Sequence, residues 1–261
     1  MPNSEWTEFL SGSVHLVARR FPRPGDGVLL LHGLAGHSGE WARVIKELPD
    51  TDVVALDLRG HGRSERRPPD VSPQAFCSDV IETIGATGHQ RVHLVGQSFG
   101  GHIAFLVASS YPERVASLTV IEADPERPKP QVEEGVERWL EGWGRPFADR
   151  SAAFAFFGTG ADSWVDGLEE RGDGLWPRFD SDVLLSALRG IIARQWWDDW
   201  NRITCPTLIV RGDRGDLPAG LAHQMAAALP EAKVISIAGA GHNVHLDQAE
   251  RVAQVVSRQL A

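Results

Sequence analysis

The amino-acid sequence predicts an α/β fold, in which a mostly parallel, doubly wound sheet carries an inserted helical cap. Short apolar runs alternate along the chain with longer segments of helical character. The runs are apolar on both faces, as expected for parallel strands that are covered by helices on each side. The alternation stops between residues 125 and 201, where the composition also changes. These observations predict the sheet and the insertion.

Apolar runs bounded by Gly, Asp or Pro predict the strands of the sheet. The parallel strands are expected at residues 28–31, 53–56, 92–95, 118–121, 207–210 and 233–237. Helices are expected between or after them, at residues 39–48, 73–86, 100–111, 219–229 and 247–260. An additional antiparallel strand is expected at the edge of the sheet, at residues 11–18.

Residues 125–201 are predicted to be a helical cap, since they contain helical patterns, no good strand and most of the chain's 9 tryptophans. The predicted domains are therefore a core made of residues 1–124 and 202–261, and a cap insertion at residues 125–201. An insertion at the carboxyl ends of the strands would cover whatever lies there. The tryptophans that we consider as pocket residues are Trp139, Trp143, Trp164, Trp176, Trp196 and Trp197.

The composition excludes several classes of protein. The 261-residue chain has 42% hydrophobic residues, which excludes disorder as its main state, and a net charge of −9, which argues against nucleic-acid binding. Apolar runs such as residues 28–31 are far too short to span a membrane, and the N-terminus resembles no signal peptide. We therefore expect a cytoplasmic protein that acts on a small molecule; its oligomeric state is not predicted.

The sequence predicts no metal and no cofactor. Cys77 and Cys205 lack the spacing of a metal or redox site, and a single pair cannot form a disulfide framework. His37, His61 and His102 fall on different segments without the spacing of metal ligands.

A candidate nucleophile lies in Gly96-Gln97-Ser98-Phe99-Gly100, which follows a predicted strand and begins a predicted helix. This G-x-S-x-G turn between strand and helix is typical of a nucleophile elbow. The glycines are needed because side chains at those positions would collide where helix and strand meet. The turn lifts the Ser98 hydroxyl above the sheet, at a helix N-terminus that favours negative charge.

A glycine-rich turn, His32-Gly33-Leu34-Ala35-Gly36, follows the first buried strand and can present backbone N–H groups to the same point. We assign the oxyanion hole to the N–H groups of Leu34 and Phe99. His32 is interpreted as a structural residue whose ring supports the loop.

The candidate general base is His242, on the loop between the last strand and the last helix. It can take the proton of Ser98 and return it to the leaving group. His245 is the alternative, and we interpret it as a surface or pocket-wall residue at the start of the final helix.

The acid that orients the histidine has three candidates. Asp216 and Asp213 follow the strand at residues 207–210, and Asp124 lies with Glu122 at the end of the strand before the cap. Asp216 is the favoured candidate. Asp124 precedes a proline, a common place for a turn residue.

The segments LLLHGLAG, ALDLRGHGRS, LVGQSFGG, TLIVRGDRGD and GAGHNVHLD, in this order, resemble the α/β-hydrolase superfamily over nearly the whole chain outside the cap. The resemblance implies Ser98 as nucleophile, His242 as base, and an acid after the strand that ends at Val210. The family's commonest acid loop, G-x-x-D, would place the acid at Gly215. This sequence resembles instead the G-x-x-S-D variant with glycine replacing serine, which points to Asp216.

The resemblance implies a serine hydrolase that acts through an acyl-enzyme. Haloalkane dehalogenases and epoxide hydrolases of this fold need an aspartate at position 98, so both are disfavoured. Ser98 suits the cleavage of a small to medium, largely apolar ester or lactone, a reaction that needs no cofactor. The alternatives are a carbon–carbon bond hydrolase, a lyase or a perhydrolase with the same triad, and a slow ligand sensor.

Overall fold

A mostly parallel, eight-stranded sheet lies at the centre of the computed structural model, which describes residues 4–126, 130–143, 146–158 and 161–260. The strands, in the order β1-β2-β4-β3-β5-β6-β9-β10, are β1 (Glu5–Ser11), β2 (Val14–Phe21), β4 (Asp52–Asp57), β3 (Gly27–Leu31), β5 (Val92–Gln97), β6 (Val115–Ile121), β9 (Thr207–Gly212) and β10 (Ala232–Ile237). β1, β2 and β4 pair antiparallel, and the neighbours from β4 to β10 pair in parallel. The predicted parallel sheet is confirmed.

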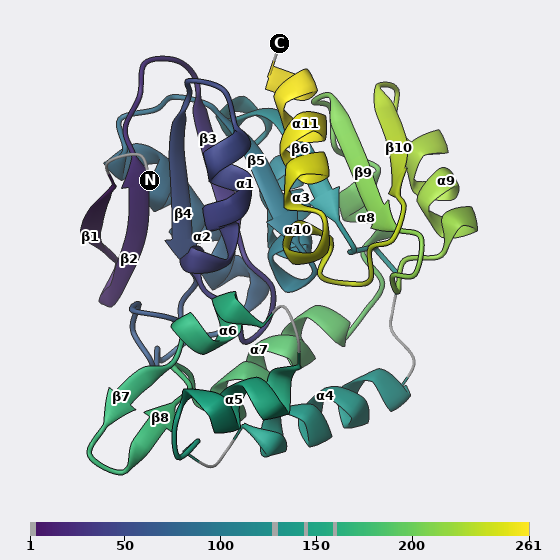
Figure 1. Ribbon diagram of the computed structural model, residues 1–261. Helices are drawn as coiled ribbons and strands as arrows, with labels where there is room; N and C mark the ends of the chain where they lie inside the picture. The colour runs from purple at the N-terminus through teal and green to yellow at the C-terminus, as the bar shows by residue number, and fades with distance from the viewer. Residues whose placement is uncertain (1–3, 127–129, 144–145, 159–160, 261) are drawn as a thin grey trace.

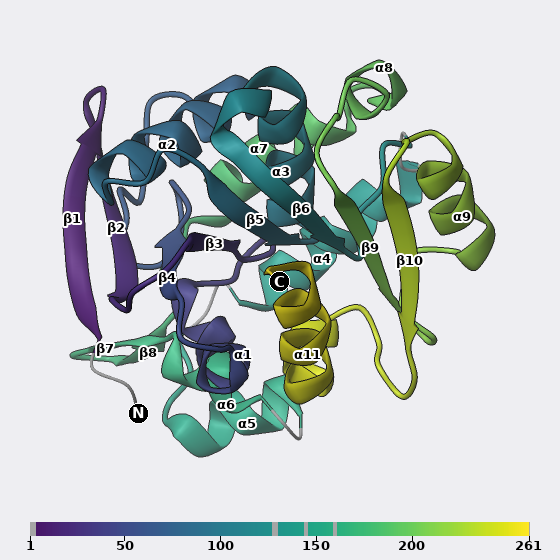
Figure 2. The same cartoon turned by 90° about the horizontal axis from the view of Figure 1, so that it is seen from above.

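Helices cover both faces of this sheet, so it is doubly wound as predicted. α1 (Ala42–Glu47) and α11 (Ala249–Leu260) lie on one face, and α2 (Pro73–Ala86) and α3 (Phe99–Ser110) lie on the other (Figure 2). The remaining core helices are η1 (Ser38–Trp41), η2 (Pro112–Arg114), α9 (Ala219–Ala227) and α10 (Val244–Asp247). Each face of the sheet has its own cluster of buried apolar side chains.

Helix α2 illustrates how the local sequence sets these elements. The Ser72 hydroxyl accepts a hydrogen bond from the N–H of Ala75 at 3.3 Å, which caps the helix, and a proline occupies its first position. Phe76, Val80 and Ile84, four residues apart, lie on one face of the helix and are fully buried.

The predicted insertion contains α4 (Pro130–Gly142), α5 (Arg150–Phe157), α6 (Asp162–Asp166) and α7 (Ser181–Ile192), which lie across the carboxyl ends of the parallel strands (Figure 1). These helices enclose a separate apolar cluster that includes Leu140, Trp143 and Leu184. The final helix of the insertion, α8 (Trp197–Trp200), packs instead against α3, where the Trp200 and Phe105 rings meet edge to face at 5.5 Å.

Polar contacts hold the cap to the core. The Arg66 guanidinium donates to the Asp180 carboxylate at 2.7 Å and also to the backbone carbonyl of Phe179 at 2.7 Å. A second contact joins His37 to α6, where the His37 Nε2 atom is hydrogen-bonded to the backbone carbonyl of Ser163 at 2.8 Å. The cap is therefore anchored to two separate loops of the core.

The sequence-based prediction of the strands was incomplete at the edge of the sheet and wrong in the cap. A single edge strand was expected at residues 11–18, but the chain forms the hairpin β1–β2, which turns at Gly12 with a φ of +60° that favours glycine. No strand was expected in the cap, but β7 (Glu169–Arg171) and β8 (Gly174–Trp176) form a short hairpin. β7 consists of charged residues, and β8 is only three residues long, so neither strand contains an apolar run of the expected length.

The sheet places the functional loops together. From β3 the chain passes to β4 on one side, whereas β5 and β6 follow on the other side, so the order of strands reverses between β3 and β5. In α/β sheets, ligands bind at the carboxyl ends of strands at such a switch point. In the described part of the chain, no helix is long and apolar enough to cross a membrane.

Candidate active site

Ser98 lies at the sharp turn between β5 and α3, with a φ of 50° and a ψ of −117°. Its N–H bonds the carbonyl of Ile121 at 2.8 Å, and its carbonyl accepts from the N–H of His102 at 3.0 Å. A Cβ atom on Gly96 would collide with the backbone of Gly100. Strand, turn and helix thus meet so closely that the elbow requires glycine, as the sequence motif predicts.

The turn after β3 packs directly against this elbow. A Cβ atom on Gly33 would lie 3.5 Å from the Cβ of Ser98 and would collide with the Gln97 side chain. The Gly36 N–H bonds the Gly33 carbonyl at 3.1 Å, which closes the turn, and Ala35 has a positive φ of 62°. The backbone of the candidate oxyanion loop is therefore held within reach of Ser98.

The two residues assigned to the oxyanion hole come from the turn after β3 and from the elbow itself. Leu34 lines the same cavity as Ser98. Phe99 is the first residue of α3, so its N–H has no partner within the helix. The Phe99 ring points into the core, where it meets Phe76 edge to face at 5.0 Å.

His32 has the structural role that we expected. It is fully buried, its Nδ1 lies 2.8 Å from the Gly33 carbonyl, and its Nε2 accepts from the N–H of Leu58 at 3.0 Å. Nε2 must be unprotonated to accept, so Nδ1 carries the proton and donates it to Gly33. With both ring nitrogens engaged, His32 is not available as a base.

His242 follows β10 and lines the same cavity as Ser98. Its Nδ1 lies 3.0 Å from a carboxylate oxygen of Asp216 and 3.5 Å from one of Glu122. Among the described residues, these are the carboxylates within 4.0 Å of its ring. The Gln97 side chain donates to the backbone carbonyl of His242 at 3.1 Å, which ties the histidine loop to the elbow.

Glu122 is the site residue that sequence reasoning missed as a partner of His242. The exposed fractions of the two carboxylate side chains differ greatly, 82% for Asp216 and 0% for Glu122. Glu122 has a positive φ of 51°, which is rare for a residue with a side chain. The available signal was a carboxylate directly after the strand at residues 118–121, where the carboxyl ends of neighbouring strands meet.

The Glu122 carboxylate also organises the acid loop. It accepts hydrogen bonds from the N–H groups of Gly212 at 2.8 Å, Asp216 at 2.7 Å and Leu217 at 3.0 Å. A Cβ atom on Gly215 would collide with this carboxylate. The unusual glycine before Asp216 therefore has a steric reason, since the loop folds closely over Glu122.

The two carboxylates determine the charge of the histidine. Burial lowers the pKa of His242, but its contacts with Asp216 and Glu122 outweigh burial and raise the pKa to about 9. The contact with His242 in turn lowers the pKa of Asp216, against the effect of burial. The site therefore stabilises the imidazolium, the state that forms when a histidine takes the proton of a serine.

The alternative acids lie elsewhere. Asp124 accepts the N–H of Glu126 at 2.8 Å, as a turn residue does, and burial raises its pKa to about 6. Asp213 is exposed and accepts the N–H of Gly239 at 2.9 Å. The structure thus brings neither of them to His242.

A cavity of about 370 Å³ contains the candidate site, within the size range of pockets for small molecules. It is lined by Gly33, Leu34, Glu40, Gln97, Ser98, Val136, Trp139, Trp164, Asp216, His242 and Asn243. Val136 and Trp139 come from α4 and Trp164 from α6, so the cap forms one wall.

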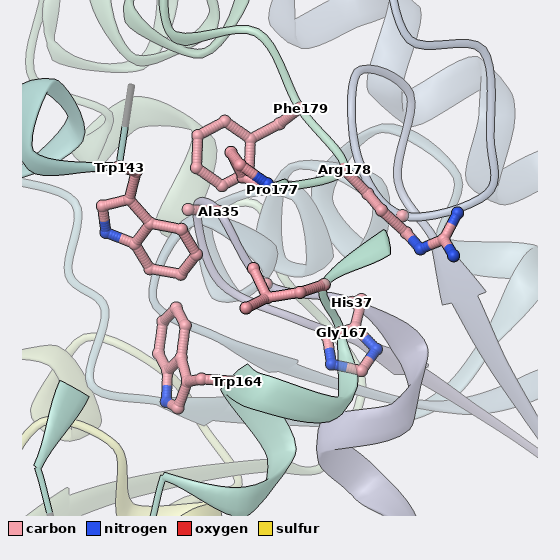
Figure 3. Close-up of a pocket in the computed structure, with 11 residues that line it drawn as sticks. Ala35, His37, Trp143, Trp164, Gly167, Pro177, Arg178 and Phe179 are labelled. Carbon is pink, nitrogen blue, oxygen red and sulfur yellow. The ribbon is translucent and has the colours of Figure 1, made fainter. Parts of the chain in front are cut away.

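Of the six tryptophans predicted for the pocket, the structure places Trp139 and Trp164 in the wall of this cavity. Their rings meet edge to face at 5.9 Å. Trp143 does not line this cavity. It is almost fully buried, with ring contacts to Trp164 at 5.2 Å and to Phe179 at 5.1 Å. With these two residues it borders a second, much smaller pocket between the cap and the turn after β3 (Figure 3). Trp143 is therefore part of the cap core, which holds the two lining rings.

The other three tryptophans, like Trp143, do not line the cavity, so the prediction was wrong for four of the six. Trp176 lies on the outer hairpin, where its N–H donates to Asp173 at 2.7 Å. Trp196 is buried in an apolar cluster of the core and donates to the carbonyl of Ile191 at 2.6 Å. Trp197 donates to Glu126 at 2.8 Å. None of these three rings lines the cavity.

His245 is neither a surface residue nor a pocket-wall residue. It is fully buried in α10, with Nε2 3.3 Å from a carboxylate oxygen of Glu40 and its ring centroid 4.6 Å from that of Trp41. The prediction failed because the turn of α10 points this side chain inward. Among the described residues, no group of three or more His, Cys, Asp or Glu side chains could hold a metal ion.

Comparisons with known proteins show the family and the fold of the chain. The family described as "Alpha/beta hydrolase family" matches residues 28–255. A Bacillus subtilis (strain 168) protein, described provisionally as a 2-succinyl-6-hydroxy-2,4-cyclohexadiene-1-carboxylate synthase, is 25% identical over 95% of each chain. Lipase LipV of Mycobacterium tuberculosis (strain ATCC 25618 / H37Rv) is 33% identical over 58% of this chain and 56% of its own. The crystal structure of E-2-(acetamidomethylene)succinate hydrolase has the same fold, with a TM-score of 0.87 and 22% identity over 98% of each chain.

Proposed function

Because the chain belongs to the alpha/beta hydrolase family, we propose that it is a serine hydrolase that cleaves a small to medium carboxylic ester or lactone without a cofactor. The observation that carries the proposal is that Ser98, His242 and Asp216 border one cavity of about 370 Å³. This is the set of groups that acyl transfer requires, with the nucleophile at a helix N-terminus.

In the proposed mechanism, the Ser98 hydroxyl attacks the carbonyl carbon while His242 takes its proton. The N–H groups of Leu34 and Phe99 stabilise the negative charge that develops on the carbonyl oxygen. The tetrahedral intermediate expels the alcohol, which receives the proton from His242, and leaves an acyl group on Ser98. Water, activated by His242, then releases the acid.

The lining of the cavity favours ester cleavage over the closest alternative. Carbon–carbon bond hydrolysis or a related lyase reaction is the second candidate, which the name of the Bacillus subtilis relative supports. That name describes a carboxylate, whereas none of the described residues lining this cavity is a lysine or an arginine. Trp139, Trp164 and Val136 provide an apolar wall suited to an uncharged ester or lactone.

A fluorophosphonate tests the proposal, since it needs only an activated serine and an oxyanion hole. We expect the intact mass of the pure protein to increase by one adduct, and peptide sequencing to place the adduct on Ser98. No adduct, together with turnover below about 10⁻² s⁻¹ on every ester and lactone tested, against a median near 10 s⁻¹ for enzymes, would favour the ligand-sensor alternative.

The pH dependence of kcat/KM is expected to show an alkaline rise. A general base must be neutral to accept a proton, and His242 is neutral only above its pKa of about 9. The value of kcat/KM should therefore increase with pH and level off above about 9, measured with an ester whose background hydrolysis is subtracted. A profile already flat above pH 7 would contradict the influence of the two carboxylates on His242.

A further inference from the structure

Glu40 is a buried carboxylate in the wall of the catalytic cavity that the proposed mechanism does not use. It lies in η1, just after the candidate oxyanion loop, and its exposed fraction is 2%. A Cβ atom on Gly36 would lie 2.9 Å from both of its carboxylate oxygens. Glu40 therefore packs directly beneath the turn that borders Ser98.

Among the described residues, one oxygen of this carboxylate has a hydrogen-bond partner and the other has none. Oε2 lies 3.3 Å from Nε2 of His245, whereas Oε1 makes no hydrogen bond to any described residue. Burial raises the pKa of Glu40, but its contacts with His245 outweigh burial and the pKa is lowered, so the carboxylate is charged at neutral pH. Its neighbours in the chain, Ser38 and Trp41, and its partner His245 also have a buried side-chain polar atom without a hydrogen-bond partner among the described residues.

A charged oxygen that is buried without a hydrogen bond is costly, and such atoms are rare in folded proteins. Glu40 is among the residues that line the cavity, so we expect a molecule bound there to come close to its carboxylate. The charges of the cavity are consistent with this, because Glu40 and Asp216 are anionic and no described lining residue is a lysine or an arginine.

We propose that Glu40 recognises a hydrogen-bond donor, a hydroxyl or an ammonium group, on the acyl part of the substrate. The proposal rests on the proposed ester hydrolysis. The acyl part stays on Ser98 in the acyl-enzyme, so a group that recognises it acts in both chemical steps. Trp139 and Trp164 suit either donor, because their rings cover the carbon chain and attract a cation. A free carboxylate at the same place is repelled by Glu40.

Matched 4-nitrophenyl esters test this proposal. Butanoate, 3-hydroxypropanoate and 3-aminopropanoate have the same number of non-hydrogen atoms in the acyl chain, and the succinate monoester adds a carboxylate. A hydrogen bond to a charged acceptor predicts a kcat/KM for the hydroxyl or the ammonium ester that is about tenfold or more above that of butanoate. The succinate monoester should be the poorest substrate. Comparing the two donor esters identifies whether the neutral or the charged donor is preferred.

Variants separate recognition from a structural role. Glu40→Gln should reduce the ratio of kcat/KM between the preferred donor ester and butanoate to near one, and Glu40→Asp should keep part of it. Glu47→Gln, the same change at an exposed residue of α1 outside the cavity, should leave the ratio unchanged. A general loss of activity in a variant lowers kcat/KM for both esters by the same factor, so it does not change their ratio.

Two results would overturn the proposal. If the wild-type protein hydrolyses the butanoate and donor esters at similar kcat/KM, recognition by Glu40 fails while the hydrolase function stands. Recognition by Glu40 also fails if Glu40→Gln lowers kcat/KM by the same factor for every ester. In that case Glu40 only positions the turn after β3 through its contact with His245. If no ester is hydrolysed and fluorophosphonate does not label Ser98, the proposed function itself fails.

Discussion

Replacing Ser98 by alanine is expected to lower kcat on an ester substrate by about 10⁶-fold, the scale seen when a serine protease loses its nucleophile. Alanine removes the hydroxyl and leaves nothing that can form the acyl-enzyme. The unusual backbone at position 98, with a φ of 50°, is compatible with alanine to the same extent as with serine, so folding should be unaffected. The measurement is kcat under saturating substrate, with circular dichroism to verify the fold.

Ser110→Ala is the matched control, because Ser110 lies at the exposed end of the same helix. It should keep full activity and full labelling by the fluorophosphonate, whereas Ser98→Ala should lose both. Residual activity of Ser98→Ala above about one hundredth of wild type would show that another group attacks the substrate, and would rule out the acyl-enzyme on Ser98.

The main elements of the fold could be predicted because their signals are local. Each parallel strand is a short apolar run, and the elbow is a contiguous motif in which glycine is required for steric reasons. The antiparallel edge was predicted only in part. The one strand expected at residues 11–18 includes the turn at Gly12 and the first half of β2, and the strand before the turn, β1, was not expected. The cap hairpin was missed because its strands, held by their pairing with each other, have no apolar run.

The side-chain directions in the site could not be predicted in the same way. A tryptophan is apolar whether it lines a cavity, as Trp139 does, or fills the core behind it, as Trp143 does. The position of Glu122 beside His242 depends on the meeting of β6 and β9, which are separated by the whole insertion. The fully buried pair Glu40 and His245 joins residues that are 205 positions apart.

Asp216→Asn is expected to lower kcat by about 10²- to 10³-fold, which is less than the roughly 10⁴-fold loss typical of a triad that loses its only acid. The reason is that Glu122 remains 3.5 Å from Nδ1 of His242 and can still favour the correct tautomer and the imidazolium. The free energy of unfolding should change little, because the Asp216 side chain is 82% exposed. Asp124→Asn and Asp213→Asn, at carboxylates without contact to His242, are the controls and should stay within a fewfold of wild type.

Glu122→Gln should combine a loss of activity with a loss of stability. A glutamine has one oxygen, so its amide nitrogen must face either the N–H of Gly212 or those of Asp216 and Leu217. A buried donor left without an acceptor costs about 1–3 kcal/mol, and we expect unfolding in denaturant to show a decrease of about this size. The pKa of His242 should fall from about 9 in this variant, which moves the alkaline rise of kcat/KM to lower pH.

The double variant Asp216→Asn/Glu122→Gln distinguishes a shared acid from a single one. With both carboxylates removed, nothing opposes the effect of burial on His242, and the loss in kcat should reach about 10⁴-fold or more. If the two carboxylates substitute for each other, the double variant loses more than the product of the single losses, because each single variant retains the other acid. If Asp216→Asn alone gives the full loss and Glu122→Gln changes stability but not kcat, Glu122 acts only as the anchor of the loop. The comparison therefore assigns the charge that supports His242 to one carboxylate or to both.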